Sequence, residues 1–237
     1  MEMFTAQHLS TKMWFELENF KSSWAIGVEL DRVVQRAVEF RLSVQAFIGS
    51  AGTQISMENL FELGDSGISI ARDLDTAAAE IDFLESTDVP LRREWRTFNN
   101  LFTPSNKTTQ TIAASLYRSV SLSLLETMLD IMLNMQSRYD HCDNLNALVS
   151  QYNETTKKTL EGICQDIRTV FAVDGESSTY QRPGIPYRTF WMLWPMTAVM
   201  TSSIAGRVQK VWVRDKLQGV GETSGLGLVT MVAKLPL

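Results

Sequence analysis

Apolar residues recur at three- and four-residue steps through most of the chain, a spacing that places side chains on one face of an α-helix. The longest uninterrupted example is the stretch 108–139, which contains neither glycine nor proline. The sequence therefore predicts a long helix here, with an apolar stripe made of Ile112, Leu116, Val120, Leu124, Met128, Ile131 and Met135.

The same spacing predicts helices on both sides of this segment. Between residues 23 and 49 the stripe is Trp24, Val28, Leu30, Val33, Val34, Ala37, Val38 and Leu42. After the turn-like sequence Gly64-Asp65-Ser66-Gly67, a second stripe consists of Ile70, Leu74, Ala77, Ala78, Ile81 and Leu84. Between residues 144 and 171 the stripe is Leu145, Leu148, Val149, Tyr152, Leu160, Ile163, Ile167 and Val170.

The last quarter of the chain begins with residues 174–186, which are rich in turn-forming residues and contain two prolines. A tryptophan-rich run, a helical run over 204–217 and a tail with closely spaced glycines follow. No alternating strand pattern of useful length is found, and no period of 20 to 50 residues repeats. These patterns predict an all-α protein, with residues 1–237 forming one domain of about eight or nine helices around an apolar pocket.

Composition and charge narrow the function classes. The 237 residues carry a formal net charge of −5, which argues against nonspecific nucleic-acid binding. Residues 61–100 carry nine acids and four bases, whereas residues 180–237 carry seven bases and two acids. We interpret both regions as solvated helix faces that pair with each other. Two cysteines and the absence of a secretory signal predict an intracellular protein, cytoplasmic or nuclear.

The tryptophan-rich run PYRTFWMLWPMTAVMTS, residues 186–202, is the most apolar part of the chain. A membrane span needs about 20 mostly apolar residues. Here only the 11 residues 190–200 qualify, and Arg188 and Arg207 bracket them. No membrane span is predicted, which leaves a packed core helix or the wall of a pocket. Pro186 is expected to start the helix, and Pro195 to kink or break it.

Metal and phosphate chemistry are not predicted. His8 and His141 are the only histidines, and in His141-Cys142-Asp143 neighbouring helical side chains point about 100° apart, so they cannot close on one ion. The glycines of residues 219–227 follow a helix instead of a strand and lack the spacing of a dinucleotide-binding loop. We expect neither a metal nor a cofactor.

The candidate catalytic residues are polar groups among apolar neighbours. Glu126 and Asp130 stand four residues apart; they are either an acid/base pair or the outer face of an amphipathic helix. Tyr117 and Arg118 interrupt the same helix, and Arg188 precedes the tryptophans. An arginine among aromatic rings can stack on a ring, hold a carboxylate or anchor a helix end.

Four motifs in the second half of the chain resemble the all-helical regulatory domain of fungal zinc-cluster transcription factors. They are Leu116-Tyr-Arg-Ser, Gly162-Ile-Cys-Gln-Asp-Ile, the run from Tyr187 to Met196, and Val211-Trp-Val-Arg-Asp-Lys-Leu-Gln-Gly-Val-Gly followed by Gly225-Leu-Gly. The resemblance covers residues 108–235. The six-cysteine zinc cluster that reads DNA in that family has no counterpart in this chain, so direct DNA binding is not expected.

The resemblance implies a role in fungal secondary metabolism and an apolar small-molecule ligand. The leading hypothesis is a cofactor-free cyclase, isomerase or cycloaddition catalyst, because such chemistry needs mainly positioning, aromatic walls and a few hydrogen-bond donors. The predicted catalytic residues are Tyr117, Arg118, Glu126, Asp130 and Arg188, and the predicted substrate-binding residues are Met128, Tyr187, Trp191 and Trp194. The alternative is a transcriptional modulator that does not bind DNA and senses a metabolite or binds a regulator. Either protein could form a homodimer.

Overall fold

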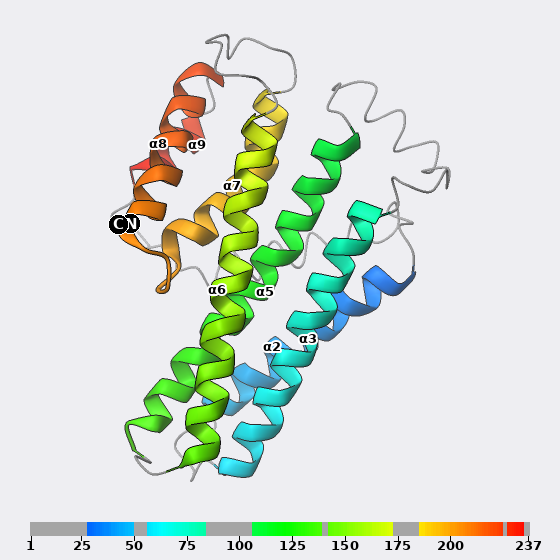
Figure 1. Cartoon of the computed structure of the whole chain (residues 1–237), viewed down its shortest axis with the longest axis vertical. Helices are drawn as coiled ribbons and strands as arrows, with labels where there is room; N and C mark the ends of the chain where they lie inside the picture. The colour runs from blue at the N-terminus through cyan, green and yellow to red at the C-terminus, as the bar shows by residue number, and fades with distance from the viewer. Residues whose placement is uncertain are drawn as a thin grey trace.

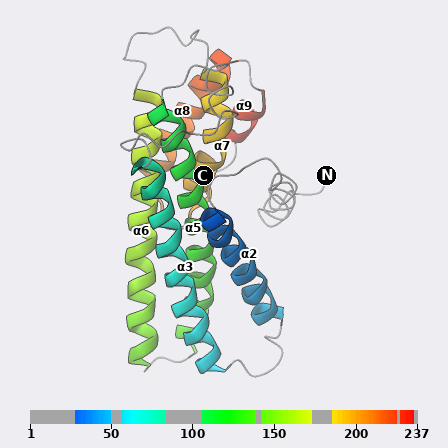
Figure 2. The same cartoon turned by 90° about the vertical axis from the view of Figure 1, so that its right-hand side faces the viewer.

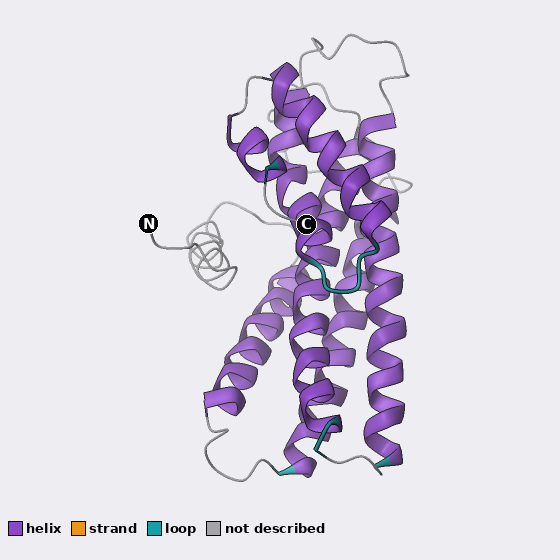
Figure 3. Ribbon diagram, turned by 90° about the vertical axis from the view of Figure 1, so that its left-hand side faces the viewer, coloured by secondary structure: helices purple, strands orange, loops and turns teal. Residues whose placement is uncertain are grey.

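The computed structural model describes residues 28–49, 56–83, 106–138, 142–172, 185–224 and 227–234. Within these ranges the chain is helical and contains no strand (Figure 3). The helices are α2 (Val28–Gly49), α3 (Met57–Phe83), α5 (Asn106–Gln136), α6 (Asp143–Ala172), α7 (Ile185–Thr201), α8 (Arg207–Ser224) and α9 (Gly227–Ala233). The predicted all-α class is confirmed.

The long helices α5 and α6 run side by side along most of the molecule and form its axis (Figures 1 and 2). Helix α3 runs beside them from the lower end past their middle, and α2 packs against α3 and α5. Helices α7, α8 and α9 gather at the upper half in these views. Because α5 contacts α2, α3, α6 and α7, more than one of its faces is buried. Its most buried residues therefore include many outside the predicted stripe: Ala114, Ser115, Ser119, Leu122, Leu125, Leu129 and Met132.

Two groups of buried apolar side chains make up the interior. The first cluster joins α2, α3 and the lower parts of α5 and α6, and it includes Phe40, Leu74, Met128 and Tyr152. The second cluster joins α7, α8 and α9 to the upper parts of α5 and α6. It includes Leu122, Ile163, Met192, Met196 and Leu217. Helices α5 and α6 contribute to both clusters and connect the two halves.

Helix α3 contains the sequence Gly64–Gly67, which was predicted to be a turn, in its interior. That prediction was wrong because these glycines serve close packing. A Cβ atom on Gly64 would lie 2.6 Å from Leu148 Cδ2, and one on Gly67 would overlap the Tyr152 hydroxyl. The Tyr152 hydroxyl donates a hydrogen bond of 2.7 Å to the Gly64 carbonyl oxygen. The glycines let α6 approach α3 closely enough for this contact.

The other predicted stripes are confirmed to different degrees. All eight residues of the α6 stripe are buried. On α2, Ala37 is buried as predicted, but Leu42 is 60% exposed, and Phe40 and Val44 take the buried positions instead. The predicted helix over 204–217 instead begins at Arg207 and runs through Gly219 and Gly221 to Ser224. Helix α7 continues through Pro195. The residues Trp24 and Leu84 and the segment 174–184 lie outside the described residues.

Candidate functional site

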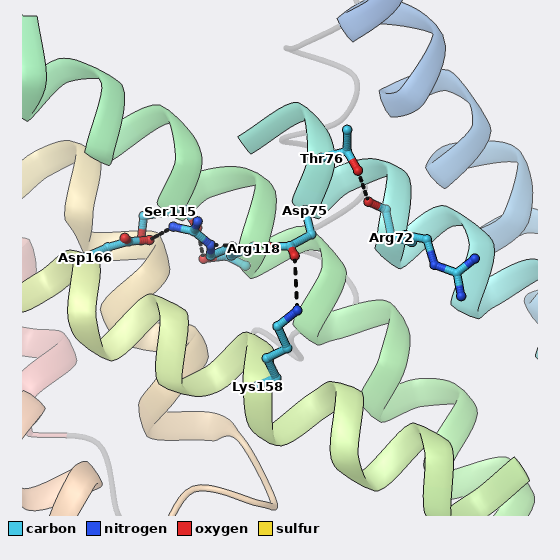
Figure 4. A network of polar contacts seen from close by, with 8 residues as sticks. Arg72, Asp75, Thr76, Ser115, Arg118, Lys158 and Asp166 are labelled. Atoms are coloured by element: carbon cyan, nitrogen blue, oxygen red, sulfur yellow. Dashed lines mark hydrogen bonds and ion pairs between the residues drawn. The ribbon is translucent and has the colours of Figure 1, made fainter. Parts of the chain in front are cut away.

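Arg118 lies at the centre of a polar network that joins three helices (Figure 4). Its Nη1 atom donates to Asp166 Oδ2 of α6 at 2.6 Å, and its Nε atom lies 3.7 Å from Asp75 Oδ1 of α3. Lys158 of α6 approaches the other oxygen of Asp75 at 3.7 Å. The Arg118 and Asp166 side chains are only 17% and 11% exposed. The Arg118–Asp166 pair is the most buried ion pair among the described residues.

The sequence makes room for Arg118 by placing Gly162 opposite it on α6. A Cβ atom at Gly162 would lie 3.1 Å from Arg118 Cδ and 3.2 Å from its Nε atom. The guanidinium therefore passes across a helix surface that has no side chain at this point. The preceding residue, Tyr117, packs against the first cluster. Arg118 is held between two carboxylates, so another anionic group could bind it only by competing with them.

Glu126 and Asp130 differ in their surroundings despite their four-residue spacing. One oxygen of Glu126 accepts hydrogen bonds from Ser202 Oγ at 2.6 Å and from the backbone N–H of Ser203 at 2.9 Å. Ser202 Oγ in turn accepts from the backbone N–H of Ala205 at 3.2 Å. Asp130 is exposed. Glu126 therefore holds the turn between α7 and α8, which neither interpretation of the sequence anticipated.

Four buried hydroxyl side chains lie on the face of α5 that carries Glu126. They are Thr108, Thr111, Ser115 and Ser119. Residues spaced by three or four along a helix share a face, and Leu122 and Glu126 lie on this same face. Leu122 belongs to the second cluster, and Glu126 contacts the turn after α7. The Ser119 hydroxyl bonds back to the Ser115 carbonyl oxygen at 2.7 Å, which satisfies it within its own helix.

Trp194 does not point with the methionines of α7, whereas Trp191 packs against the second cluster, which contains them. Met192 and Met196 are fully buried in the second cluster. Two residues along a helix turn by about 200°, so Trp194 lies on the opposite side of α7 from both methionines. Phe190, which is 56% exposed, lies on the same side as Trp194. We call Phe190, Trp191 and Trp194 the aromatic face of α7.

The aromatic face contains a hydrogen-bond donor without an acceptor. The Trp194 side chain is half-buried, and its Nε1 atom is buried and forms no hydrogen bond with any described residue. The rings of Phe190 and Trp191 meet edge to face, with centroids 5.8 Å apart and an angle of 86° between their planes. A buried indole N–H normally finds a partner, because leaving it unsatisfied costs about 1–3 kcal/mol.

The remaining predicted site residues lie in different surroundings. Arg188, in the first turn of α7, is buried. Met128 is fully enclosed in the first cluster, whereas the tryptophans belong to α7, so the predicted wall residues do not form one group. The backbone of Tyr187 is helical, and its side chain lies outside the described residues.

Sequence reasoning missed Asp166 and Asp75, although a signal for Asp166 was present. Asp166 lies beside Ile167 and three residues after Ile163, within the apolar stripe of α6, so an acid at this position is expected to have a cationic partner. The partner is 48 residues away in sequence, and nothing local identifies it. Asp75 has no such signal, because it lies on the exposed side of α3.

The two cysteines are both free thiols. Burial raises the pKa of the Cys164 thiol, with the positive charge of Arg168 acting in the opposite direction. A raised thiol pKa lowers the thiolate population at neutral pH. Cys164 is therefore poorly suited to nucleophilic catalysis.

No group of three or more His, Cys, Asp and Glu side chains in the described part of the chain is arranged to hold a metal ion. None of the described helices is both long and apolar enough to cross a membrane. His8 and His141 lie outside the described residues.

These features define a helical protein with a three-helix ion network and an aromatic face on α7. Comparison of the chain with protein-family models, curated proteins and solved structures finds no match in any of the three. The resemblance to the fungal regulatory domain therefore depends only on the motifs given above.

Proposed function

We propose that the protein binds an apolar small molecule carrying a hydrogen-bond acceptor against the aromatic face of α7. The observation that carries this proposal is the buried, unpartnered Nε1 atom of Trp194. Phe190 and Trp191 provide apolar ring surface beside it. A ligand that combines a carbonyl or ether oxygen with an apolar body would satisfy the N–H and cover the rings.

The proposed role is that of a cofactor-free catalyst of fungal secondary metabolism that cyclises or isomerises its ligand. The indole N–H and the aromatic rings of α7 are suited to positioning a ligand and not to transferring protons. The Trp194 N–H can donate to an oxygen on which negative charge develops, and the rings can hold the reacting chain in a folded conformation. Glu126 is engaged by the Ser202–Ser203 turn, and Arg118 is engaged by Asp166 and Asp75. The acid/base candidates are therefore not assigned to the reaction.

A transcriptional modulator is the second candidate, and the surface of α8 favours it. Val208 is 82% exposed on a helix that also carries Arg207, Lys210 and Arg214. Such a surface suits a protein partner. In this function a metabolite bound at α7 would alter the partner's affinity, because α7 and α8 pack together.

Gene deletion followed by reconstitution separates these functions. For a catalyst, deletion leaves pathway transcripts unchanged and causes an intermediate to accumulate. The purified protein then converts that intermediate without any added cofactor. Loss of pathway transcripts together with no conversion in vitro would exclude the catalyst and support the modulator.

A further inference from the structure

One flank of α8 carries three basic residues on a single ridge. Arg207, Lys210 and Arg214 follow one another at three- and four-residue steps, so they share one side of the helix. Within the described residues none of the three forms an ion pair. Val211 stands between Arg207 and Arg214 on the helix surface, and Val208 lies one turn before it. We call these three bases the basic ridge.

The first part of α3 carries the complementary feature. Glu58, Glu62 and Asp65 follow at four- and three-residue steps, and all three are exposed. None forms an ion pair with a described residue. Phe61, which is half-buried, lies beside them on the same helix. We call these three acids the acidic ridge.

The two ridges match in antiparallel orientation. Along α3 the steps are four and then three, and read backwards along α8 from Arg214 they are also four and then three. Each ridge is about 10 Å long at 1.5 Å per residue. Glu58 would face Arg214, Glu62 would face Lys210, and Asp65 would face Arg207. Each ridge also has apolar side chains next to its charges.

The ridges cannot meet within one chain. The start of α3 lies at the lower end of the molecule and α8 at the upper end in both views (Figures 1 and 2). We propose that the basic ridge of one copy of this chain docks on the acidic ridge of a second copy. Two copies placed antiparallel would make this contact twice and form a closed dimer.

Charge complementarity determines the strength and salt dependence of this contact. Exposed ion pairs each contribute little, and salt screens them over about 10 Å at 0.1 M ionic strength. The association is therefore weak, concentration-dependent and lost at high salt. This salt dependence distinguishes the proposed contact from an interface that buries mainly apolar surface, because added salt does not dissociate an apolar interface.

Sedimentation velocity on the full chain over a range of concentrations tests the proposal. In about 0.05 M salt the mass of the wild type rises with concentration, and in about 0.5 M salt it stays monomeric. The double variant Glu58→Lys with Glu62→Lys, and separately Lys210→Glu with Arg214→Glu, lowers the association constant at least about tenfold because like charges then face each other. Mixing the two variants restores association, since each swapped ridge finds a complementary ridge on the other chain.

The matched control for the acidic-ridge variant is Glu154→Lys with Glu161→Lys, which changes the net charge by the same amount at two exposed positions of α6. It retains wild-type association, and circular dichroism confirms that every variant keeps its helix content. Three results would overturn the proposal: a wild type that is monomeric at low salt, loss of association in the control as well, or no recovery in the mixture.

Discussion

At the scale of single residues, Tyr152 combines burial with a specific hydrogen bond. Its side chain is fully buried in the first cluster, and its hydroxyl donates to the Gly64 carbonyl oxygen. Burial raises the pKa of this hydroxyl, and the negative charge of Asp65 raises it further. The folded protein therefore holds the phenolic proton more tightly than the unfolded chain, whose tyrosines titrate near pH 10.

Replacing Tyr152 with Phe tests this environment. At pH 7 we expect the free energy of unfolding to fall by about 1 kcal/mol, because one hydrogen bond is lost. A raised folded-state pKa gives stability that is complete below about pH 10 and is lost as pH rises through the folded value. Tyr152→Phe has no phenol at this position and does not lose this stability as pH rises. The difference in the free energy of unfolding between the wild type and the variant should therefore become smaller above pH 10. Urea denaturation of both proteins at pH 7, 9 and 10.5 measures it, and a constant difference would contradict the account.

Arg118 tests the energetics of the ion network. Arg118→Met keeps an unbranched chain but removes a cation from Asp166, which is buried, so we expect a loss of about 3 kcal/mol. Adding Asp166→Asn to this variant should recover part of the loss because it removes the buried charge. The control is Arg36→Met, which removes the exposed ion pair with Asp73 and should cost less than about 1 kcal/mol. Equal losses in the two single variants, measured by urea denaturation, would show that the network has no special role.

At the scale of elements, the glycines of α3 fix how closely α3 and α6 pack. Gly67→Ala places a methyl group against the Tyr152 hydroxyl and 2.9 Å from Phe40 Cζ, so we expect a loss of about 1–3 kcal/mol. Gly219→Ala in α8 is the matched control, since its Cβ meets nothing within 4 Å. The control should gain about 0.5–1 kcal/mol from helix propensity. A gain at both positions in thermal denaturation would show that α3 and α6 are not closely packed.

The elements also show how far periodicity alone can predict this fold. All eight residues of the predicted α6 stripe are buried, although α6 also buries Thr156, Cys164 and Asp166, which the stripe does not include. The α5 stripe was predicted only in part, because α5 is surrounded by other helices and buries Ser115 and Ser119, which no apolar pattern includes. The interior of α3 was misread at Gly64, since the same residue type serves turns and close helix contacts. The local sequence pattern cannot distinguish a glycine in a turn from a glycine at a close helix–helix contact.

At the scale of the whole molecule, α5 and α6 join two hydrophobic clusters, and the polar contacts lie where the helices meet. Arg118 and Arg188 stood out from sequence as polar residues among aromatics, and the structure buries Arg188 and pairs Arg118 with Asp166. Their partners and the orientation of Trp194 depend on which helices become neighbours. That arrangement is set by packing over distances that no local motif encodes, so the candidate site could be predicted only as separate residues.

The central claim is that an apolar ligand accepts a hydrogen bond from Trp194 on the aromatic face of α7. It is tested by isothermal titration of the intermediate that accumulates after gene deletion into the wild type, Trp194→Phe and Trp212→Phe. Trp212 of α8 serves as the control. The Cζ atom of Arg168 lies over its ring, 5.1 Å from the centroid of that ring. We expect Trp194→Phe to bind about five- to tenfold more weakly with unchanged helix content, and Trp212→Phe to bind like the wild type. Equal affinity for Trp194→Phe and the wild type would contradict the claim.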